Sequence, residues 1–165
     1  MAASLVHRHC VHDRASCIVS YGMDKRPADQ RSTVYLGTPL AKKLGIGANA
    51  HVVVLHAPMS YVELLEPLPP GVSFAARPTA LTDIAHVFVD TKSTLKCELV
   101  SLREKLRGNA TIWISWPKKS SKVRTDVTED AIRELALPLG FVDVKVCAIT
   151  DVWSGLKLVV RQKLR

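Results

Sequence analysis

The residue types most able to do chemistry gather where an apolar stretch gives way to a basic one. Residues 110–116 are mostly β-branched or aromatic, and a Pro-Lys-Lys segment follows at once. Lysine ammonium groups, indole faces and the amides of a Ser-Gly turn can hold a phosphate or carboxylate beside a flat apolar group. A solvated basic loop, or a contact with nucleic acid or protein, is the alternative interpretation. The candidate ligand-binding residues are Trp116, Pro117, Lys118, Lys119, Asp90, Trp153, Ser154 and Gly155.

Few residues suit catalysis. Asp90, at the end of an apolar stretch, is the best single candidate for acid or base chemistry. Ser115 and Lys118 match a Ser-x-x-Lys spacing, but that motif needs the start of a helix, and Pro117 indicates the end of a strand. Cys147 has no histidine near it in the sequence. No catalytic residue is predicted, and the sequence leans against an enzyme. Three histidines in expected strands are interpreted as structural groups: His51, His56 and His86.

The first 34 residues differ from the rest because they lack apolar periodicity. Their soft ligands could bind Zn²⁺ or Cu⁺, but the spacing matches no standard zinc finger, so no metal site is predicted. Residues 1–34 are expected to be a disordered tail, or an extension ahead of a natural start at Met23, and residues 35–165 to form the domain. The ligands in question are His7, His9, Cys10, His12 and Cys17.

Composition limits the class of protein. A chain of 165 residues with 47% hydrophobic and 23% charged residues suits one soluble domain. The net charge of +8 favours phosphate-bearing partners, among which nucleic acid is a possible one. No apolar run is long enough for a membrane span, so no membrane partner is expected. The four cysteines form no disulfide framework, which predicts a cytoplasmic protein. The oligomeric state is left open.

The elements that must position the candidate residues alternate between strand and helix patterns. Apolar runs predict strands at 51–57, 72–76, 84–89, 110–116, 141–148 and 156–161. Helical spacing or capping residues predict helices at 40–44, around 61–65, at 91–106 and from 128. This alternation predicts an α/β domain with a mostly parallel sheet. Ligands of such sheets lie beyond the carboxyl ends of the strands. A parallel 141–148 strand would also bring Trp153 near Trp116.

The order of parts resembles the methyltransferase version of the Rossmann-like fold. Three features occupy the places that such features hold in that family: Gly108 ahead of residues 110–116, the Gly140-Phe141 turn and the closing hairpin. The resemblance implies a single three-layer domain whose sheet has the order 2-1-3-4-6-5, with an antiparallel last strand.

The cofactor-binding segments of that family have no counterpart in this sequence. The family's first strand ends in an acidic residue and a glycine-rich turn, whereas residues 55–60 contain no glycine. Its second strand usually ends in a carboxylate for the ribose hydroxyls, where Arg77 and Pro78 stand in this chain. We therefore expect no bound cofactor, and S-adenosylmethionine (SAM) should not bind below the millimolar range.

A closer resemblance is to a small bacterial family described only as a domain of unknown function. It implies one Rossmann-like domain in a bacterial cytoplasm and no particular activity. The segments that carry it are Gly-Thr-Pro-Leu-Ala-Lys-Lys-Leu-Gly at 37–45, Trp-Pro-Lys-Lys at 116–119, Thr-Asp-Val-Thr-Glu at 125–129, Leu-Pro-Leu-Gly-Phe-Val-Asp-Val-Lys-Val-Cys-Ala at 137–148 and Trp-Ser-Gly-Leu-Lys at 153–157.

Together these observations favour a non-catalytic or cryptic module that binds an anionic small ligand or partner at the edge formed by Lys118 and Lys119. One alternative is a divergent SAM-dependent methyltransferase that accepts its adenosyl cofactor through unusual contacts. A nucleic-acid-associated protein is the other.

Overall fold

The structure of the protein, a computed structural model, describes residues 37–165. The predictions made for the first 34 residues, including the His/Cys cluster and the start at Met23, lie outside this range. None of the described helices is both long and apolar enough to span a bilayer.

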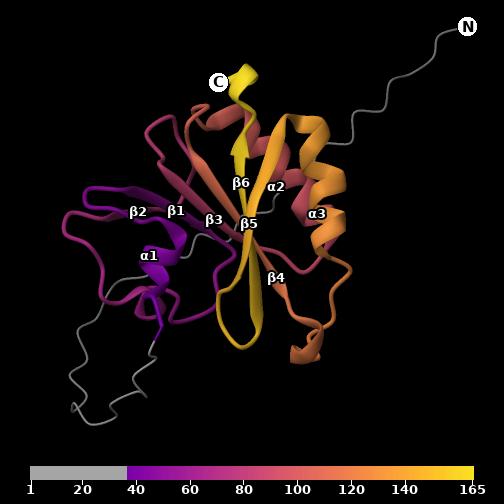
Figure 1. The fold of residues 1–165 in the computed structure, drawn as a ribbon, viewed down its shortest axis with the longest axis horizontal. Coiled ribbons are helices and arrows are strands. Elements are labelled where there is room, and N and C mark those ends of the chain that lie inside the picture. The colour runs from indigo at the N-terminus through magenta and orange to yellow at the C-terminus, as the bar shows by residue number, and fades with distance from the viewer. Residues whose placement is uncertain (1–36) are drawn as a thin grey trace, which may run out of the picture. The chain divides into compact units, whose positions relative to one another are not determined.

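Six strands form one sheet in the order β2-β1-β3-β4-β6-β5 (Figure 1). The first four strands of that order pair in parallel, and β6 is antiparallel to both of its neighbours. The predicted α/β class, strand order and antiparallel last strand are confirmed. The strands are β1 (His51–Leu55), β2 (Ser73–Ala75), β3 (Ile84–Phe88), β4 (Thr111–Pro117), β5 (Phe141–Ala148) and β6 (Trp153–Val160).

Helices lie on both faces of this sheet. The longest is α2, whose fourteen residues cross back from β3 to β4. Thr91 and Thr128 cap α2 and α3, since their hydroxyls accept hydrogen bonds from the amides of Thr94 and Ala131. The α-helices are α1 (Leu40–Leu44), α2 (Lys92–Lys105) and α3 (Glu129–Ala136), and the 3₁₀ turns are η1 (Glu63–Leu65), η2 (Lys119–Ser121), η3 (Leu137–Leu139) and η4 (Gln162–Leu164).

Alternate residues of the central strands supply two separate cores, as the period of two in a strand requires. One core lies under α2 and α3 and includes Ile112, Ile114 and Leu99. The other lies under α1 and η1 and includes Trp113 and Leu44. The indole nitrogen of Trp113 donates to the backbone carbonyl of Leu44 over 2.9 Å, so the largest buried side chain of the described residues ties α1 to the sheet.

Several element ends differ from the sequence-based expectation. The first strand stops at Leu55 because His56 adopts a left-handed backbone with φ of 55°, which breaks the extended conformation. Pro39, with no side-chain hydrogen bond, precedes α1 where Thr38 was expected to cap it. The helix α2 ends at Lys105 with Leu106 as its C-cap, so Gly108 does not cap it. The last strand begins earlier than predicted, at Trp153.

The closing hairpin brings its loop to the carboxyl edge of the parallel strands. Because β6 is antiparallel to β4 and β5 is antiparallel to β6, β5 runs parallel to β4. The register pairs Trp116 with Ser154 and Pro117 with Trp153. The amide of Lys118 donates to the carbonyl of Val152 over 2.8 Å, which fixes the loop against the end of β4. The sequence predicted that Trp153 would lie near the Trp116 edge if the 141–148 strand were parallel to β4. That strand is parallel to β4.

Candidate functional site

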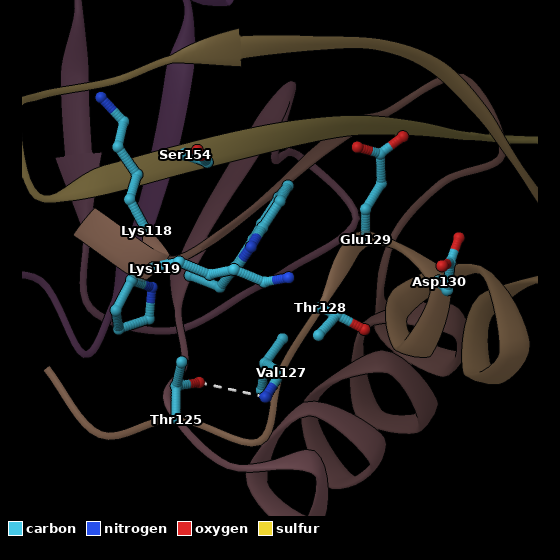
Figure 2. A pocket seen from close by; sticks show the side chains of 10 residues that line it. Lys118, Lys119, Thr125, Val127, Thr128, Glu129, Asp130 and Ser154 are labelled. Carbon is cyan, nitrogen blue, oxygen red and sulfur yellow. Dashed lines mark hydrogen bonds between the residues drawn. The ribbon is translucent and has the colours of Figure 1, made fainter. Parts of the chain in front are cut away.

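A pocket of about 460 Å³ lies where β4 ends and α3 begins (Figure 2). Its volume is within the range of small-molecule sites. Five of the eight candidate residues predicted from the sequence line it: Trp116, Pro117, Lys118, Lys119 and Ser154. The remaining lining residues were not predicted: Thr125, Val127, Thr128, Glu129 and Asp130.

The pocket wall that the sequence did not predict is a loop fixed in place by polar contacts. The hydroxyl of Thr125 donates to the backbone carbonyl of Asp90 over 2.7 Å. The carboxylate of Asp126 accepts a 2.7 Å hydrogen bond from the amide of Lys92, at the N-terminus of α2. These bonds fix residues 125–127 beside the pocket. The Thr-Asp-Val-Thr-Glu segment can be recognised in the sequence. Its docking beside α2 cannot, because it depends on contacts between residues more than 30 positions apart.

The two lysines of the basic segment play different parts. The ammonium group of Lys118 donates to the backbone carbonyl of Thr150 over 2.6 Å, so it ties two loops together. In Figure 2 it points away from Thr125 and Val127, whereas the side chain of Lys119 runs toward Thr128 and Glu129. Lys119 is exposed and makes no hydrogen bond among the described residues. Only Lys119 therefore offers its charge to the pocket.

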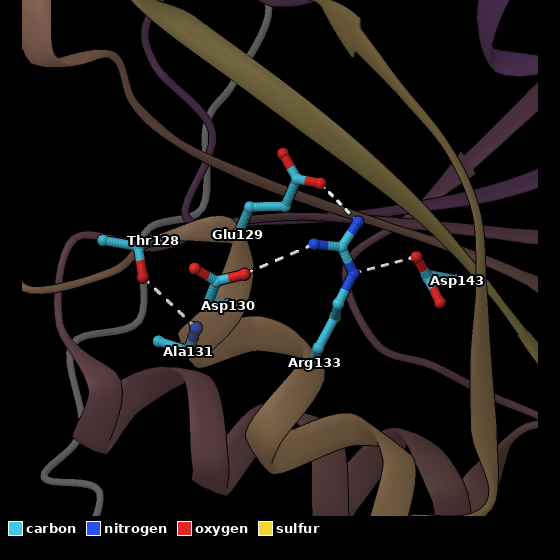
Figure 3. Close-up of polar contacts among 6 residues, drawn as sticks. All are labelled: Thr128, Glu129, Asp130, Ala131, Arg133 and Asp143. Atoms are coloured by element: carbon cyan, nitrogen blue, oxygen red, sulfur yellow. Dashed lines mark hydrogen bonds and ion pairs between the residues drawn. The ribbon is translucent and has the colours of Figure 1, made fainter.

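One arginine contacts two acidic groups at the start of α3 and a third on β5 (Figure 3). The guanidinium of Arg133 contacts the carboxylates of Glu129, Asp130 and Asp143. Its hydrogen bonds to Asp143 and then to Glu129 raise the pKa of Arg133, and the same bond to Arg133 lowers the pKa of Asp143. One positive charge offsets only part of three negative ones, so this wall of the pocket keeps an acidic character, with Lys119 as the basic group beside it.

Three of the predicted site residues do not line the pocket: Trp153, Gly155 and Asp90. The ring of Trp153 packs edge-on against Phe88, with ring centroids 5.1 Å apart, in the core under α1. Trp153 and Trp116 lie on neighbouring strands but belong to opposite cores. A Cβ at Gly155 would lie 2.7 Å from Cδ1 of Ile149, so this glycine allows close packing.

At the switch point of the sheet, between β1 and β3, the structure presents two further groups. Asp90 follows β3, and its exposed carboxylate has no hydrogen-bond partner in residues 37–165. His56 follows β1, and its Nε2 lies 2.8 Å from Oε1 of Glu98 on α2. The interpretation of His56 as a strand residue was wrong, since it stands beyond the strand, and Glu98 was not singled out by the sequence pattern.

The other candidate nucleophiles are buried or occupied. Ser115 is fully buried, and its Oγ lies 2.7 Å from Nε2 of His86, whose Nδ1 lies 2.7 Å from the hydroxyl of Tyr61. Burial lowers the pKa of His86 to about 3 and raises the pKa of Tyr61. Burial also raises the pKa of the Cys147 thiol. Ser115, His86 and Tyr61 therefore form a buried hydrogen-bonded chain.

Comparison with known proteins identifies the fold. No family model matches the sequence, and no curated protein matches it either. The complex of DhpI with SAH has a TM-score of 0.53 at 10% identity, over 75% of this chain and 83% of that one. A SAM-dependent methyltransferase from Clostridium acetobutylicum ATCC 824 has a TM-score of 0.51 at 7% identity, over 73% and 87%. LepI in complex with SAH and a substrate analogue has a TM-score of 0.53 at 12% identity, over 81% of this chain and half of that one.

These comparisons correct the functional interpretation drawn from the sequence. The interpretation as a non-catalytic module binding an anion through Lys118 and Lys119 is contradicted, because structures with this fold include a SAM-dependent methyltransferase and proteins bound to SAH. The side chains give a physical reason as well. The ammonium group of Lys118 donates to the Thr150 carbonyl, so it is not presented as an anion ligand. The described domain has the Rossmann-like fold of SAM-dependent methyltransferases.

Proposed function

We propose that this protein is a divergent SAM-dependent methyltransferase. The observation that carries the proposal is the fold: the domain built on this six-stranded sheet resembles a SAM-dependent methyltransferase and two proteins bound to SAH (S-adenosylhomocysteine), with TM-scores of 0.51 to 0.53. A ligand-sized pocket at the carboxyl edge of that sheet supports it. The adenosyl ligand would lie beyond β1 and β3, at the switch point.

The residues beyond β1 suit one end of such a ligand. His56 and Ser60 have φ values of 55° and 66°, so the backbone turns there in the left-handed conformation that glycine usually supplies. The His56–Glu98 pair adds one basic and one acidic group at the same edge. The end of β2 lacks the carboxylate expected for a ribose, because Arg77 follows it. When bound, SAM would supply an activated methyl group, and no step of its transfer is assigned to a residue.

The pocket beside Trp116 is the proposed place for the methyl acceptor. Trp116 is 9% exposed and gives the pocket an apolar wall, while Lys119 and the Thr128 hydroxyl supply polar contacts. An acceptor with a flat apolar part and an anionic group would match this combination. This assigns the candidate residues Trp116, Pro117, Lys119 and Ser154 to acceptor binding. Asp90 stands between the two proposed sites as the available carboxylate.

The sequence resemblance further supports assignment of residues 35–165 to the small bacterial family described only as a domain of unknown function. That assignment carries a bacterial and cytoplasmic setting with it. The five matching segments include the Trp-Pro-Lys-Lys and Thr-Asp-Val-Thr-Glu runs that line the pocket.

Calorimetry with SAH tests the proposed function. We expect SAH to bind the full chain with a dissociation constant in the micromolar range, which reverses the sequence-based expectation of no bound cofactor. ATP is the control ligand, because a protein with a net charge of +8 attracts any polyphosphate. SAH should bind more tightly than ATP at 0.15 M salt, an ionic strength at which long-range attraction is screened within about 8 Å. No heat with millimolar SAH, or equal binding of ATP, would contradict the proposal.

A further inference from the structure

The pair formed by His56 and Glu98 joins the segment after β1 to the second turn of α2, across 42 residues of sequence. The His56 side chain is 43% exposed and that of Glu98 is 16% exposed. Each partner uses one atom in the contact. Nδ1 of His56 and Oε2 of Glu98 have no hydrogen-bond partner among residues 37–165. The pair therefore has one nitrogen and one carboxylate oxygen left for a ligand.

Stability alone gives little reason for this arrangement. A non-glycine residue in the left-handed region is uncommon, and His56 adopts it with φ of 55°. Glycine would adopt the same backbone conformation without a steric clash between Cβ and the backbone. An ion pair with one half-exposed partner contributes little to folding. A strained backbone that holds a polar side chain at the ligand edge of a sheet is a feature associated with function.

The charges of the pair complement those of an α-amino acid. Oε2 of Glu98 can accept from an ammonium group, and a protonated imidazole donates from Nδ1 while Nε2 remains on Glu98. The ammonium and carboxylate of an amino acid are carried by the same carbon, so both can reach adjacent partners at once. The 2.8 Å contact between Nε2 and Oε1 holds the two side chains side by side, so a ligand that reaches Glu98 also lies next to the His56 ring.

We propose that His56 and Glu98 bind the amino-acid end of the adenosyl ligand, with Glu98 accepting from its α-ammonium group and His56 donating to its α-carboxylate. This inference rests on the proposed function, since it assigns residues to the ligand named there. The pair would stand in place of the acidic residue and glycine-rich turn that the sequence lacks after β1.

Two ligands that differ only at the amino-acid end test the assignment. SAH carries that end, and 5′-methylthioadenosine has the same adenosine and thioether without it. Binding of both to the wild-type chain, to Glu98→Gln and to the control Glu104→Gln is measured by calorimetry. Glutamine at 98 can still accept the hydrogen bond from His56, and Glu104 is an exposed residue of the same helix. The control makes the same change of charge.

We expect SAH to bind the wild type at least tenfold more tightly than 5′-methylthioadenosine. In Glu98→Gln the affinity for SAH should fall about tenfold, since a charge-assisted contact is lost, while that for 5′-methylthioadenosine stays unchanged. Glu104→Gln should behave as the wild type. Equal losses for both ligands, or no loss for SAH, would overturn the assignment and leave the proposed function standing. If the wild type binds neither ligand, both the assignment and the proposed function fail.

A second variant guards against a folding defect. His56→Gln keeps a nitrogen donor near Glu98 and should weaken SAH without affecting 5′-methylthioadenosine. Circular dichroism melts identify a variant that does not fold. Should Glu98→Gln unfold, the same ligand pair measured on His56→Gln decides the question by the same criterion.

Discussion

Replacing Trp113 with alanine is expected to lower the free energy of unfolding by about 3–5 kcal/mol, the range for large-to-small changes at buried aromatic residues. Trp113 is 0% exposed and packs in the core under α1. Its indole nitrogen donates to the carbonyl of Leu44, and the Lys145 ammonium lies 5.6 Å from its ring centroid. The alanine variant loses the packing, the hydrogen bond and the anchor of α1 together. Urea denaturation of the full chain measures the loss.

Trp113→Phe is the matched comparison. It keeps most of the apolar area but leaves the Leu44 carbonyl without its donor, so a smaller loss of about 1–3 kcal/mol is expected. A loss below 1 kcal/mol for Trp113→Ala would show that α1 does not depend on this side chain.

Stability should fall as the pH drops below 6.5 because of His86. Its pKa is about 3 in the folded protein and 6.5 in an ordinary environment, and burial is the cause. Between these values the unfolded chain binds the proton and the folded chain does not, so protonation favours unfolding. The stability contributed by neutral His86 is present above pH 6.5 and is lost progressively toward pH 3. The full effect is on the order of 5 kcal/mol, at about 1.4 kcal/mol for each pKa unit.

The range from pH 6.5 to 5 isolates this effect, because ordinary carboxylates stay ionised there. We expect the free energy of unfolding to decrease by about 1–2 kcal/mol over that range. The triple variant Tyr61→Phe, His86→Leu and Ser115→Ala removes all three members of the buried chain, leaves none of them without a partner, and should abolish most of the decrease. His51→Gln, at an exposed histidine, should keep it. A wild-type stability that is flat between pH 6.5 and 5 would contradict a neutral buried His86.

The sheet could be predicted from the sequence because local patterns determine it. The fully buried β3 is apolar except for His86, and α1 and β5 begin and end at the predicted residues. Glycine and proline residues predicted the ends of some helices and strands less accurately. Gly108 lies past the end of α2, and Pro117 remains in β4 because it is the strand's last residue, where a missing amide costs little.

The candidate site could be predicted only where one segment supplies it. Trp116 and Lys119 follow from a single strand end, so the sequence pattern found them. Glu98 joins the site through His56, 42 residues away, and no local pattern encodes that meeting. The different parts played by Lys118 and Lys119 likewise depend on the Thr150 carbonyl, which the hairpin brings to β4. Two adjacent lysines therefore have different surroundings, since the ammonium group of Lys118 is held by a backbone carbonyl and Lys119 is exposed.

The central claim is that an adenosyl ligand binds at the carboxyl edge beyond β1 and β3. Amide chemical shifts of the ¹⁵N-labelled chain, followed during titration with SAH, test it most directly. We expect saturable shifts at the amides of residues 56, 57, 59, 60 and 90–92, together with a shift at the amide of Glu98. Spectra unchanged at millimolar SAH, or shifts confined to the edge strand β5, would contradict it.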